Sequence, residues 1–271
     1  MVVTAGVDAG ASSTKAVVLS EDRRILGRAI AMTSASPAQA AEKVYAAALE
    51  QAGLTPRDVR YVVSTGFGRY MVPFRDVQVT DFVSHAQGAL YHFPQTRCVL
   101  DIGAQSTRAS NIEPIGRVKT FRMNSRCAAG AGAFLVRVAH YLEVPLAELA
   151  ERALRAQKAQ PISSVCAVLA ETEIINHITS GSTEEDIIAG VMEAVANQGL
   201  ILLRKAGIES ELTLTGGLSM NPAMVQTLSR LAGLPVNVSA NGADGGLFAG
   251  ALGASILAQM RLAKLDSTAR A

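Results

Sequence analysis

Residues 8–15 read Asp-Ala-Gly-Ala-Ser-Ser-Thr-Lys, and residues 101–108 read Asp-Ile-Gly-Ala-Gln-Ser-Thr-Arg. The two octapeptides are identical at five positions, and both end in a basic residue. Each copy follows a β-rich apolar run, at residues 2–7 and 98–100, and is followed by another possible strand, at residues 16–19 and 109–112. Each copy therefore reads as a strand, a tight glycine turn and a second strand. Chance similarity between two Gly/Ser-rich turns is the alternative, but five identities in one short context favour an internal repeat.

The rest of the chain alternates predicted strands and helices. We expect further strands at residues 59–64, 118–123 and 212–215, and helices at residues 37–51, 81–92, 133–142, 146–158, 170–179, 182–206 and 244–262, with one more beginning near Asn221. Ser182 and Glu185 form a predicted capping-box pair. The pattern predicts an α/β protein with a first subdomain at residues 1–95 and a second at 96–271, whose closing helix packs back on the first.

Composition argues against several classes of function. With 49% hydrophobic residues in 271, the chain can bury a large core, and its formal net charge is only +2. No charged block indicates binding to nucleic acid or to a membrane surface. The start of the chain lacks the pattern of a secretory leader, and charged residues interrupt the apolar stretches. We therefore expect a cytoplasmic protein.

The repeated turns are suited to phosphate chemistry, because a polyphosphate needs close backbone N–H donors and a metal held by carboxylates. Asp8 and Asp101 stand at strand ends, where they can orient hydrated Mg²⁺. Gln105 can orient a water molecule for hydrolysis. Lys15 either adds positive charge near the phosphates or is a solvated strand residue. The predicted phosphate-binding residues of the two turns are Gly10, Ala11, Ser12, Ser13, Thr14, Lys15, Gly103 and Ala104.

A third glycine turn, Thr215-Gly216-Gly217, separates the late strand from the helix near Asn221. Alone it is weak evidence. Two phosphate hairpins followed by strand, Gly-Gly and helix resemble the superfamily of actin, sugar kinases and chaperone ATPases. That resemblance implies the actin-like fold: two ribonuclease-H-like subdomains around a nucleotide cleft, with ATP or ADP between them and the late glycines against the adenosine.

Two of the three cysteines, Cys127 and Cys166, stand just ahead of predicted helices. Helix N-termini stabilise thiolates and the sulfurs of a metal cluster. Two cysteines cannot fill a four-thiolate site, but two copies of the chain can. Inert buried thiols are the alternative. The four histidines are too scattered to predict a metal site.

The sequence motifs around these cysteines show a second resemblance. "CAAGAGAFL" at residues 127–135, "SSVCAVLAETEII" at 163–175 and "LTGGLSMN" at 214–221 resemble the ATP-dependent activators of 2-hydroxyacyl-CoA dehydratases and the ATP-binding subunits of benzoyl-CoA reductase. The likeness extends from "GVDAGASSTK" at 6–15 to "GLFAGALGAS" at 246–255.

The resemblance implies an anaerobic ATPase that works as a dimer, with one 4Fe-4S cluster held by Cys127 and Cys166 of each subunit. Cys98 matches no ligand motif and is expected in the core. Hydrolysis would drive a low-potential electron, supplied by a ferredoxin or flavodoxin, into a dehydratase or reductase component acting on a CoA thioester.

Ala104 and Ser106 depart from the Gly and Asp that activators commonly have at the second loop. This difference slightly favours the reductase-subunit branch over the activator branch. The dimer is therefore expected to be either a homodimer or a pair with a paralogous subunit. An ATP-dependent kinase for a sugar or similar small molecule is the main alternative, but it leaves both cysteines unexplained. A polymerising actin-like scaffold is the non-enzymatic alternative.

Overall fold

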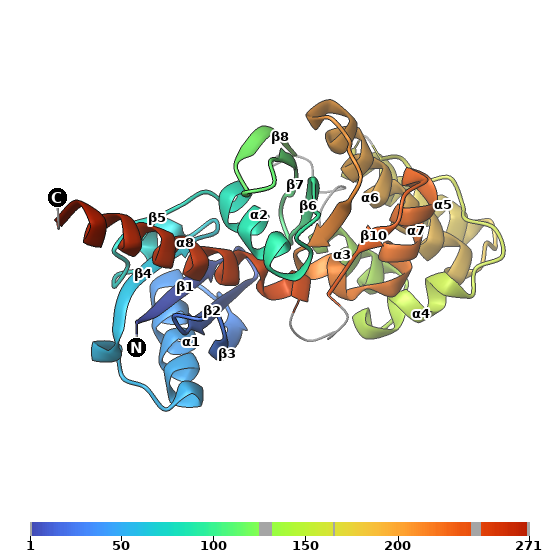
Figure 1. The fold of residues 1–271 in the computed structure, drawn as a ribbon. Coiled ribbons are helices and arrows are strands. Elements are labelled where there is room, and N and C mark those ends of the chain that lie inside the picture. The colour runs from blue at the N-terminus through green and yellow to red at the C-terminus, as the bar shows by residue number, and fades with distance from the viewer. Residues whose placement is uncertain (1, 125–131, 165, 240–244, 270–271) are drawn as a thin grey trace. The chain divides into compact units, whose positions relative to one another are not determined.

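The computed structural model describes residues 2–124, 132–164, 166–239 and 245–269, and the chain forms two compact units (Figure 1). The first consists of Met1–Pro94, Ile115–Arg117 and Phe248–Ala271, and the second of Gln95–Pro114 and Val118–Leu247. Helix α8 (Gly245–Ala269) therefore belongs to the first unit from Phe248 onward, although it comes last in the sequence.

The first unit is built on a mixed five-stranded sheet with the order β3-β2-β1-β4-β5. Strands β1, β2 and β3 are antiparallel neighbours, and β4 and β5 continue the sheet parallel to β1. Its strands are β1 (Val3–Ala9), β2 (Ser13–Leu19), β3 (Ile25–Met32), β4 (Val59–Thr65) and β5 (Val77–Gln78). Its other helical elements are α1 (Pro37–Ala52), η1 (Pro56–Asp58), η2 (Arg69–Met71) and α2 (Asp81–His92).

Strand β1 is buried on both faces because a helix covers each one. Val3, Ala5, Val7 and Ala9 share one hydrophobic cluster with Val44, Tyr45 and Ala48 of α1. The alternate residues face α8, where Thr4 Oγ1 donates to the carbonyl of Ser255 and a Cβ at Gly6 would overlap the α8 backbone. The two-residue period of a strand thus divides β1 between two helices.

The second unit repeats this topology with the strand order β10-β9-β6-β7-β8. Strands β6, β7 and β8 are antiparallel neighbours, and β9 and β10 continue parallel to β6. Its strands are β6 (Cys98–Ile102), β7 (Thr107–Ile112), β8 (Val118–Asn124), β9 (Leu212–Thr215) and β10 (Val236–Asn237). Its helical elements are α3 (Gly132–Tyr141), η4 (Leu146–Glu148), α4 (Leu149–Leu154), α5 (Ala167–Thr179), α6 (Glu184–Ala206), η5 (Gly217–Met220) and α7 (Pro222–Ala232). The predicted α/β class is confirmed.

The core of the second unit packs α3, α6 and α7 against β6 and β9. Cys98, Leu100 and Ile102 point into this core, so Cys98 lies where the sequence placed it. Helix α6 crosses β6 at Gly199, where a Cβ would come within 2.9 Å of the Leu100 side chain. A residue without a side chain therefore sets the close approach of helix and sheet.

Two predictions of local structure were wrong, and three edge strands were missed. The helix expected at residues 146–158 is a 3₁₀ turn followed by α4, which ends at Leu154. The N-cap of α6 is Thr183, whose side chain accepts from the amide of Asp186, instead of Ser182. The edge strands β3, β5 and β10 were not predicted.

Helices α6 and α8 are long and apolar enough to cross a membrane by length and composition. The expectation that charges interrupt every such stretch was therefore too strict. In each helix, 67% of the 18-residue segment with high mean hydropathy is buried inside the protein. Core helices that are apolar on most sides have this character.

Candidate functional site

Asp8 lies near the end of β1 with its side chain only 8% exposed. The sheet register places Lys15 of β2 directly opposite, and the Lys15 Nζ lies 3.5 Å from Asp8 Oδ2. On its other side, Asp8 pairs with Thr65, the last residue of β4. Lys15 is buried in this ion pair, so the alternative of a solvated strand residue was wrong.

Asp101 occupies the equivalent place at the end of β6. Arg108 of β7 is its cross-strand partner, with Nη1 at 2.8 Å from Asp101 Oδ2, and Thr215 of β9 is its partner on the parallel side. The repeat recognised in the sequence therefore extends to the neighbours of each aspartate.

A glycine with positive φ follows each of these threonines. Gly66 has φ +92° and Gly216 has φ +83°. A Cβ on Gly66 would lie 2.5 Å from Asp8 Oδ1, and one on Gly216 would overlap Asp101 Oδ1. Both glycines are thus required by backbone conformation and by the nearby carboxylate. Sequence analysis identified Gly216 but missed Gly66, although the Thr-Gly pair after a strand was a usable signal.

The first phosphate turn is held by β3 and the residue that follows it. The amide of Thr33 donates to the carbonyl of Ser12, its hydroxyl donates to the carbonyl of Gly10 at 2.6 Å, and it also bonds to the Thr14 hydroxyl. A Cβ on Gly10 would lie 2.7 Å from the Ser13 carbonyl. Ala11 and Ser13 are half-buried. Thr33 was missed because it lies far from the turn in sequence.

The second phosphate turn is closed by a bond from the amide of Gly103 to the carbonyl of Ser106 at 3.0 Å. Ala104 is half-buried, and Gln105 is exposed at the tip. The turn also touches the start of α3, since the amides of Gly132 and Ala133 donate to the carbonyls of Gly103 and Ala104, both at 2.8 Å.

His85 of α2 adds a buried titratable group beside Asp8. The position of a Cβ on Gly250 would lie 2.9 Å from His85 Nε2 and 3.0 Å from Asp8 Oδ2. Gly250 of α8 thus leaves room for both side chains. The sequence pattern indicated no functional role for His85, because the four histidines are scattered along the chain.

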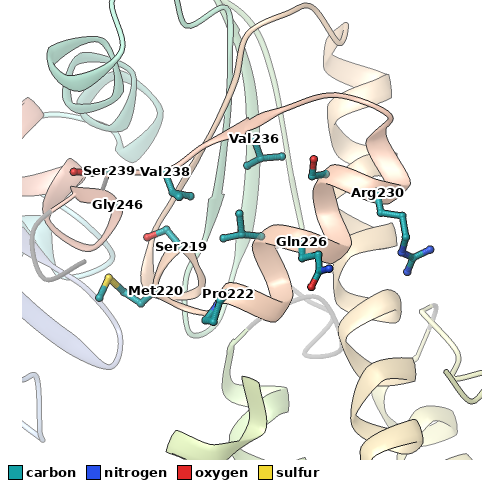
Figure 2. Close-up of a pocket in the computed structure, with 11 residues that line it drawn as sticks. Ser219, Met220, Pro222, Gln226, Arg230, Val236, Val238, Ser239 and Gly246 are labelled. Atoms are coloured by element: carbon teal, nitrogen blue, oxygen red, sulfur yellow. The ribbon is translucent and has the colours of Figure 1, made fainter. Parts of the chain in front are cut away.

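A cavity of about 680 Å³ opens next to the Thr215–Gly217 turn (Figure 2). Its lining begins at Ser219 and Met220 and continues along α7 through Pro222, Gln226 and Arg230, while Val236 and Val238 lie across from the helix (Figure 2). Gly246 completes the lining, and its carbonyl accepts from the amide of Gly216 at 2.8 Å. The volume and mixed lining suit a small organic ligand.

Cys98 and Cys166 differ in their surroundings. Cys166 is the N-cap of α5, half-buried, and its side chain makes no capping bond. Burial raises the pKa of the Cys98 thiol, which lies in the core and accepts from the amide of Glu209. Cys127 falls outside the described residues. Within the described ranges no three His, Cys, Asp or Glu side chains gather in a way that could hold a metal ion.

Comparison with known proteins places these features in a family. The model of the BadF/BadG/BcrA/BcrD ATPase family matches residues 5–258. The chain belongs to this family. The chain is similar to the activator of lactoyl-CoA dehydratase from Anaerotignum propionicum, which is 35% identical over 94% of this chain and 96% of its own length. A benzoyl-CoA reductase subunit from Thauera aromatica is 34% identical over 98% of this chain and 96% of its own length.

A solved structure of the same family supports the fold. The activator of 2-hydroxyisocaproyl-CoA dehydratase from Clostridium difficile, with bound ADPNP, superposes with a TM-score of 0.89 at 30% identity, covering 98% of this chain and 97% of that one. The prediction of an actin-like ATPase fold is confirmed, and the family match favours the ATPase over the sugar kinase. Identities of 35% and 34% do not separate the activator branch from the reductase branch.

Proposed function

We propose that this member of the ATPase family is a cytoplasmic iron–sulfur protein that hydrolyses ATP to drive a low-potential electron into a dehydratase or reductase acting on a CoA thioester. The observation that carries the nucleotide part is the duplicated set of aspartate, basic residue, threonine and glycine at the ends of β1 and β6. Two equivalent carboxylates, each beside a glycine turn, suit a metal-bound polyphosphate.

The residues of each set have separate tasks in this proposal. Asp8 and Asp101 hold the water shell of Mg²⁺, which supplies charge neutralisation at the phosphates when bound. The turn at residues 10–14 and Ala104 offer backbone N–H groups, while the Gly103 amide is bonded to the Ser106 carbonyl and closes the second turn. Gln105, exposed at the tip of that turn, orients the attacking water. Lys15 and Arg108 keep each carboxylate in place through their ion pairs.

The adenosine belongs in the cavity that follows Gly217. The cavity carries an apolar side from Met220, Val236 and Val238 and polar groups from Ser219 and Gln226, which suits a flat heteroaromatic base with polar edges. The bond from Gly216 to Gly246 connects this cavity to the glycine beside Asp101. Base and phosphate subsites would thus share one turn in the second unit.

The cluster would be held by Cys166 and Cys127 of two subunits, and it would supply one-electron transfer at low potential. Cys166 fits this role because its half-buried side chain stands at the N-terminus of a 13-residue helix, where the first backbone N–H groups can bond to the sulfurs of a cluster. Cys98 does not fit, since its raised pKa favours the thiol. Exposed Val168, Ile175 and Ile178 give α5 an apolar face that a second copy could cover.

Anaerobic purification with an absorption spectrum and an iron and sulfide assay tests the proposal. We expect a brown protein with about four irons per dimer, from two thiolates in each subunit. Cys127→Ser and Cys166→Ser should each abolish the colour. Cys98→Ser is the matched control and should retain it, because a hydroxyl can keep the bond from Glu209. A full cluster in either ligand variant would contradict the assignment.

A further inference from the structure

Glu171 of α5 binds two side chains of α3 at once. Its Oε1 accepts from Arg137 Nε at 2.7 Å, and its Oε2 accepts from the Tyr141 hydroxyl at 3.2 Å. The Glu171 side chain is 23% exposed and that of Arg137 is 38% exposed. Both oxygens of one carboxylate therefore connect the two helices that follow the candidate cluster cysteines, and charge-assisted bonds of this kind are stronger than neutral ones.

The other end of α3 rests on the second phosphate turn. Gly132 and Ala133 donate their amides to Gly103 and Ala104, which satisfies two of the N–H groups left free at a helix start. A Cβ on Gly132 would lie 3.3 Å from the Gly103 carbonyl, so helix and turn are in close contact. A rearrangement of this turn would shift the start of α3, because helices move as rigid elements.

Helix α5 has little other anchorage in the core. Of its 13 residues, Ala170 and Ile174 are buried. Val168, Leu169, Ile175 and Ile178 are exposed. Glu173 accepts from the Ser163 amide, and His177 Nε2 lies 3.1 Å from the Pro161 carbonyl, so these bonds hold α5 to the segment that precedes it. The Glu171 contacts are side-chain bonds that connect α5, and with it the N-cap Cys166, to α3.

We propose that Glu171 is a positioning residue that transmits the state of the phosphate turn to Cys166. The route runs from Gly103 and Ala104 to the start of α3, through Arg137 and Tyr141 to Glu171, and along α5 to its N-cap. The inference rests on the proposed function, which makes residues 103–104 a phosphate-binding turn and Cys166 a cluster ligand. Each link of the route between them is a contact within the second unit. A chain of contacts does not by itself show that a change is transmitted, so the coupling between the phosphate turn and α5 has to be measured.

Hydrogen exchange on the full-length, cluster-free protein provides that measurement. Peptides from α3 and α5 are compared without nucleotide, with Mg-ADP and with a non-hydrolysable Mg-ATP analogue, and nucleotide binding is measured separately by calorimetry. The test variants are Glu171→Ala, which removes both contacts, and Tyr141→Phe, which removes one hydroxyl and preserves the fold if the first variant is unstable. Glu184→Ala is the matched control, because it breaks another interhelical ion pair in the same unit, with Arg152.

In the wild type we expect exchange in both helices to differ between the two nucleotides. In Glu171→Ala the α3 response should remain while the α5 response falls roughly threefold or more. Tyr141→Phe should give an intermediate loss, and Glu184→Ala should behave as wild type. An unchanged α5 response in Glu171→Ala would overturn the inference while leaving the proposed function intact, as would a wild type in which α3 responds and α5 does not. A wild type that binds no nucleotide would overturn the proposed function and this inference with it.

Discussion

Asp8 and Asp101 have the same three kinds of neighbour: a basic residue across the antiparallel pair, a threonine across the parallel pair, and a positive-φ glycine against one oxygen. The oxygen near the base and the oxygen near the glycine are different atoms in both cases. Each carboxylate is therefore fixed in rotation as well as in place. Such fixed geometry is what positioning a hydrated metal requires.

Removing either negative charge should weaken catalysis. We expect Asp8→Asn and Asp101→Asn each to lower kcat for Mg²⁺-dependent ATP hydrolysis at least about tenfold, a loss of about 1.4 kcal/mol in transition-state stabilisation. Steady-state phosphate release measures this. Asp22→Asn is the control, since Asp22 is an exposed acid in a turn of the same unit. Near wild-type turnover in either test variant would mean that the repeat is only structural.

The glycine at position 216 should resist even the smallest side chain. Gly216→Ala places a Cβ against Asp101 Oδ1 in a left-handed backbone conformation, which costs roughly 1–3 kcal/mol in strain alone. We expect lower stability together with a loss of ATPase activity, measured by thermal unfolding and phosphate release. Gly233→Ala separates the two effects, because Gly233 also has positive φ but has open space around it. It should lose stability and keep turnover.

The sequence predicted the residues that repeat visibly and missed those that only the sheet register brings close. Asp8, Gly10 and Asp101 belong to one conspicuous octapeptide pair. Thr33 reaches the first turn through long-range strand pairing, which no local pattern reveals. Gly66 follows a threonine at the end of a strand, as Gly216 does, and this local signal was overlooked. Their roles, like those of Gln105 and Cys127, stay predictions.

At the scale of elements, helix boundaries depended on tertiary contacts that the local pattern could not show. The helical sequence pattern at residues 146–158 continues beyond Leu154, where α4 ends. The amides of Gln157 and Lys158 instead donate to Asp186 Oδ1 at the start of α6, and not to carbonyls of their own helix. Helix α1, by contrast, begins at Pro37 as expected, because its N-cap, Ser36, bonds only to a neighbour in sequence, the amide of Gln39.

Asp186 should make this junction depend on pH. The bond from the Lys158 amide, together with the bond from the Gln157 amide and a side-chain bond with Thr183, holds the pKa of Asp186 below its usual value of 3.8. A carboxyl with a lowered folded-state pKa contributes stability above its unfolded value, and that contribution is lost as pH falls through the folded value. We therefore expect Asp186→Asn to lower Tm at neutral pH, with the difference from wild type closing below pH 3.8.

Thermal unfolding followed by circular dichroism across this pH range measures the effect. Asp266→Asn, at an exposed position of α8, is the charge-matched control. A constant Tm difference from neutral to acid pH would show that the Asp186 carboxylate charge contributes nothing to the junction.

At the scale of the whole molecule, the two units repeat one order of five strands, with three antiparallel strands followed by two parallel ones. The octapeptide repeat predicted this duplication because it stands at the same hairpin of each sheet. Strands β5 and β10 escaped prediction because two residues are too few to show a period. Helices α3 and α5 of the second unit lie outside this repeat, so the repeat cannot predict them, and the candidate cluster ligand Cys166 is the N-cap of α5.

The last prediction joins the nucleotide to the cluster. The amides at the start of α3 are bonded to the phosphate turn, and α3 is bonded to α5, so the setting of Cys166 should respond to what occupies the turn. A change in the surroundings of cluster ligands alters both access to the iron and the reduction potential. We therefore expect an iron chelator to strip iron at different rates from the ADP and ATP forms of the holoprotein, and the reduction potential to differ between them.

Gln105→Ala separates nucleotide binding from hydrolysis in this experiment. Gln105 is exposed at the tip of a turn that is closed by the backbone bond from Gly103 to Ser106, so its removal leaves the turn itself in place. The variant should keep the difference in chelation rate between ADP and ATP while hydrolysis slows, and because ATP then persists, the ATP-form rate should last longer than in wild type. Equal chelation rates and equal reduction potentials in both nucleotide states would contradict the coupling between nucleotide and cluster. This holds even for a protein that has a cluster and hydrolyses ATP, because hydrolysis would then not change the energy of the transferred electron.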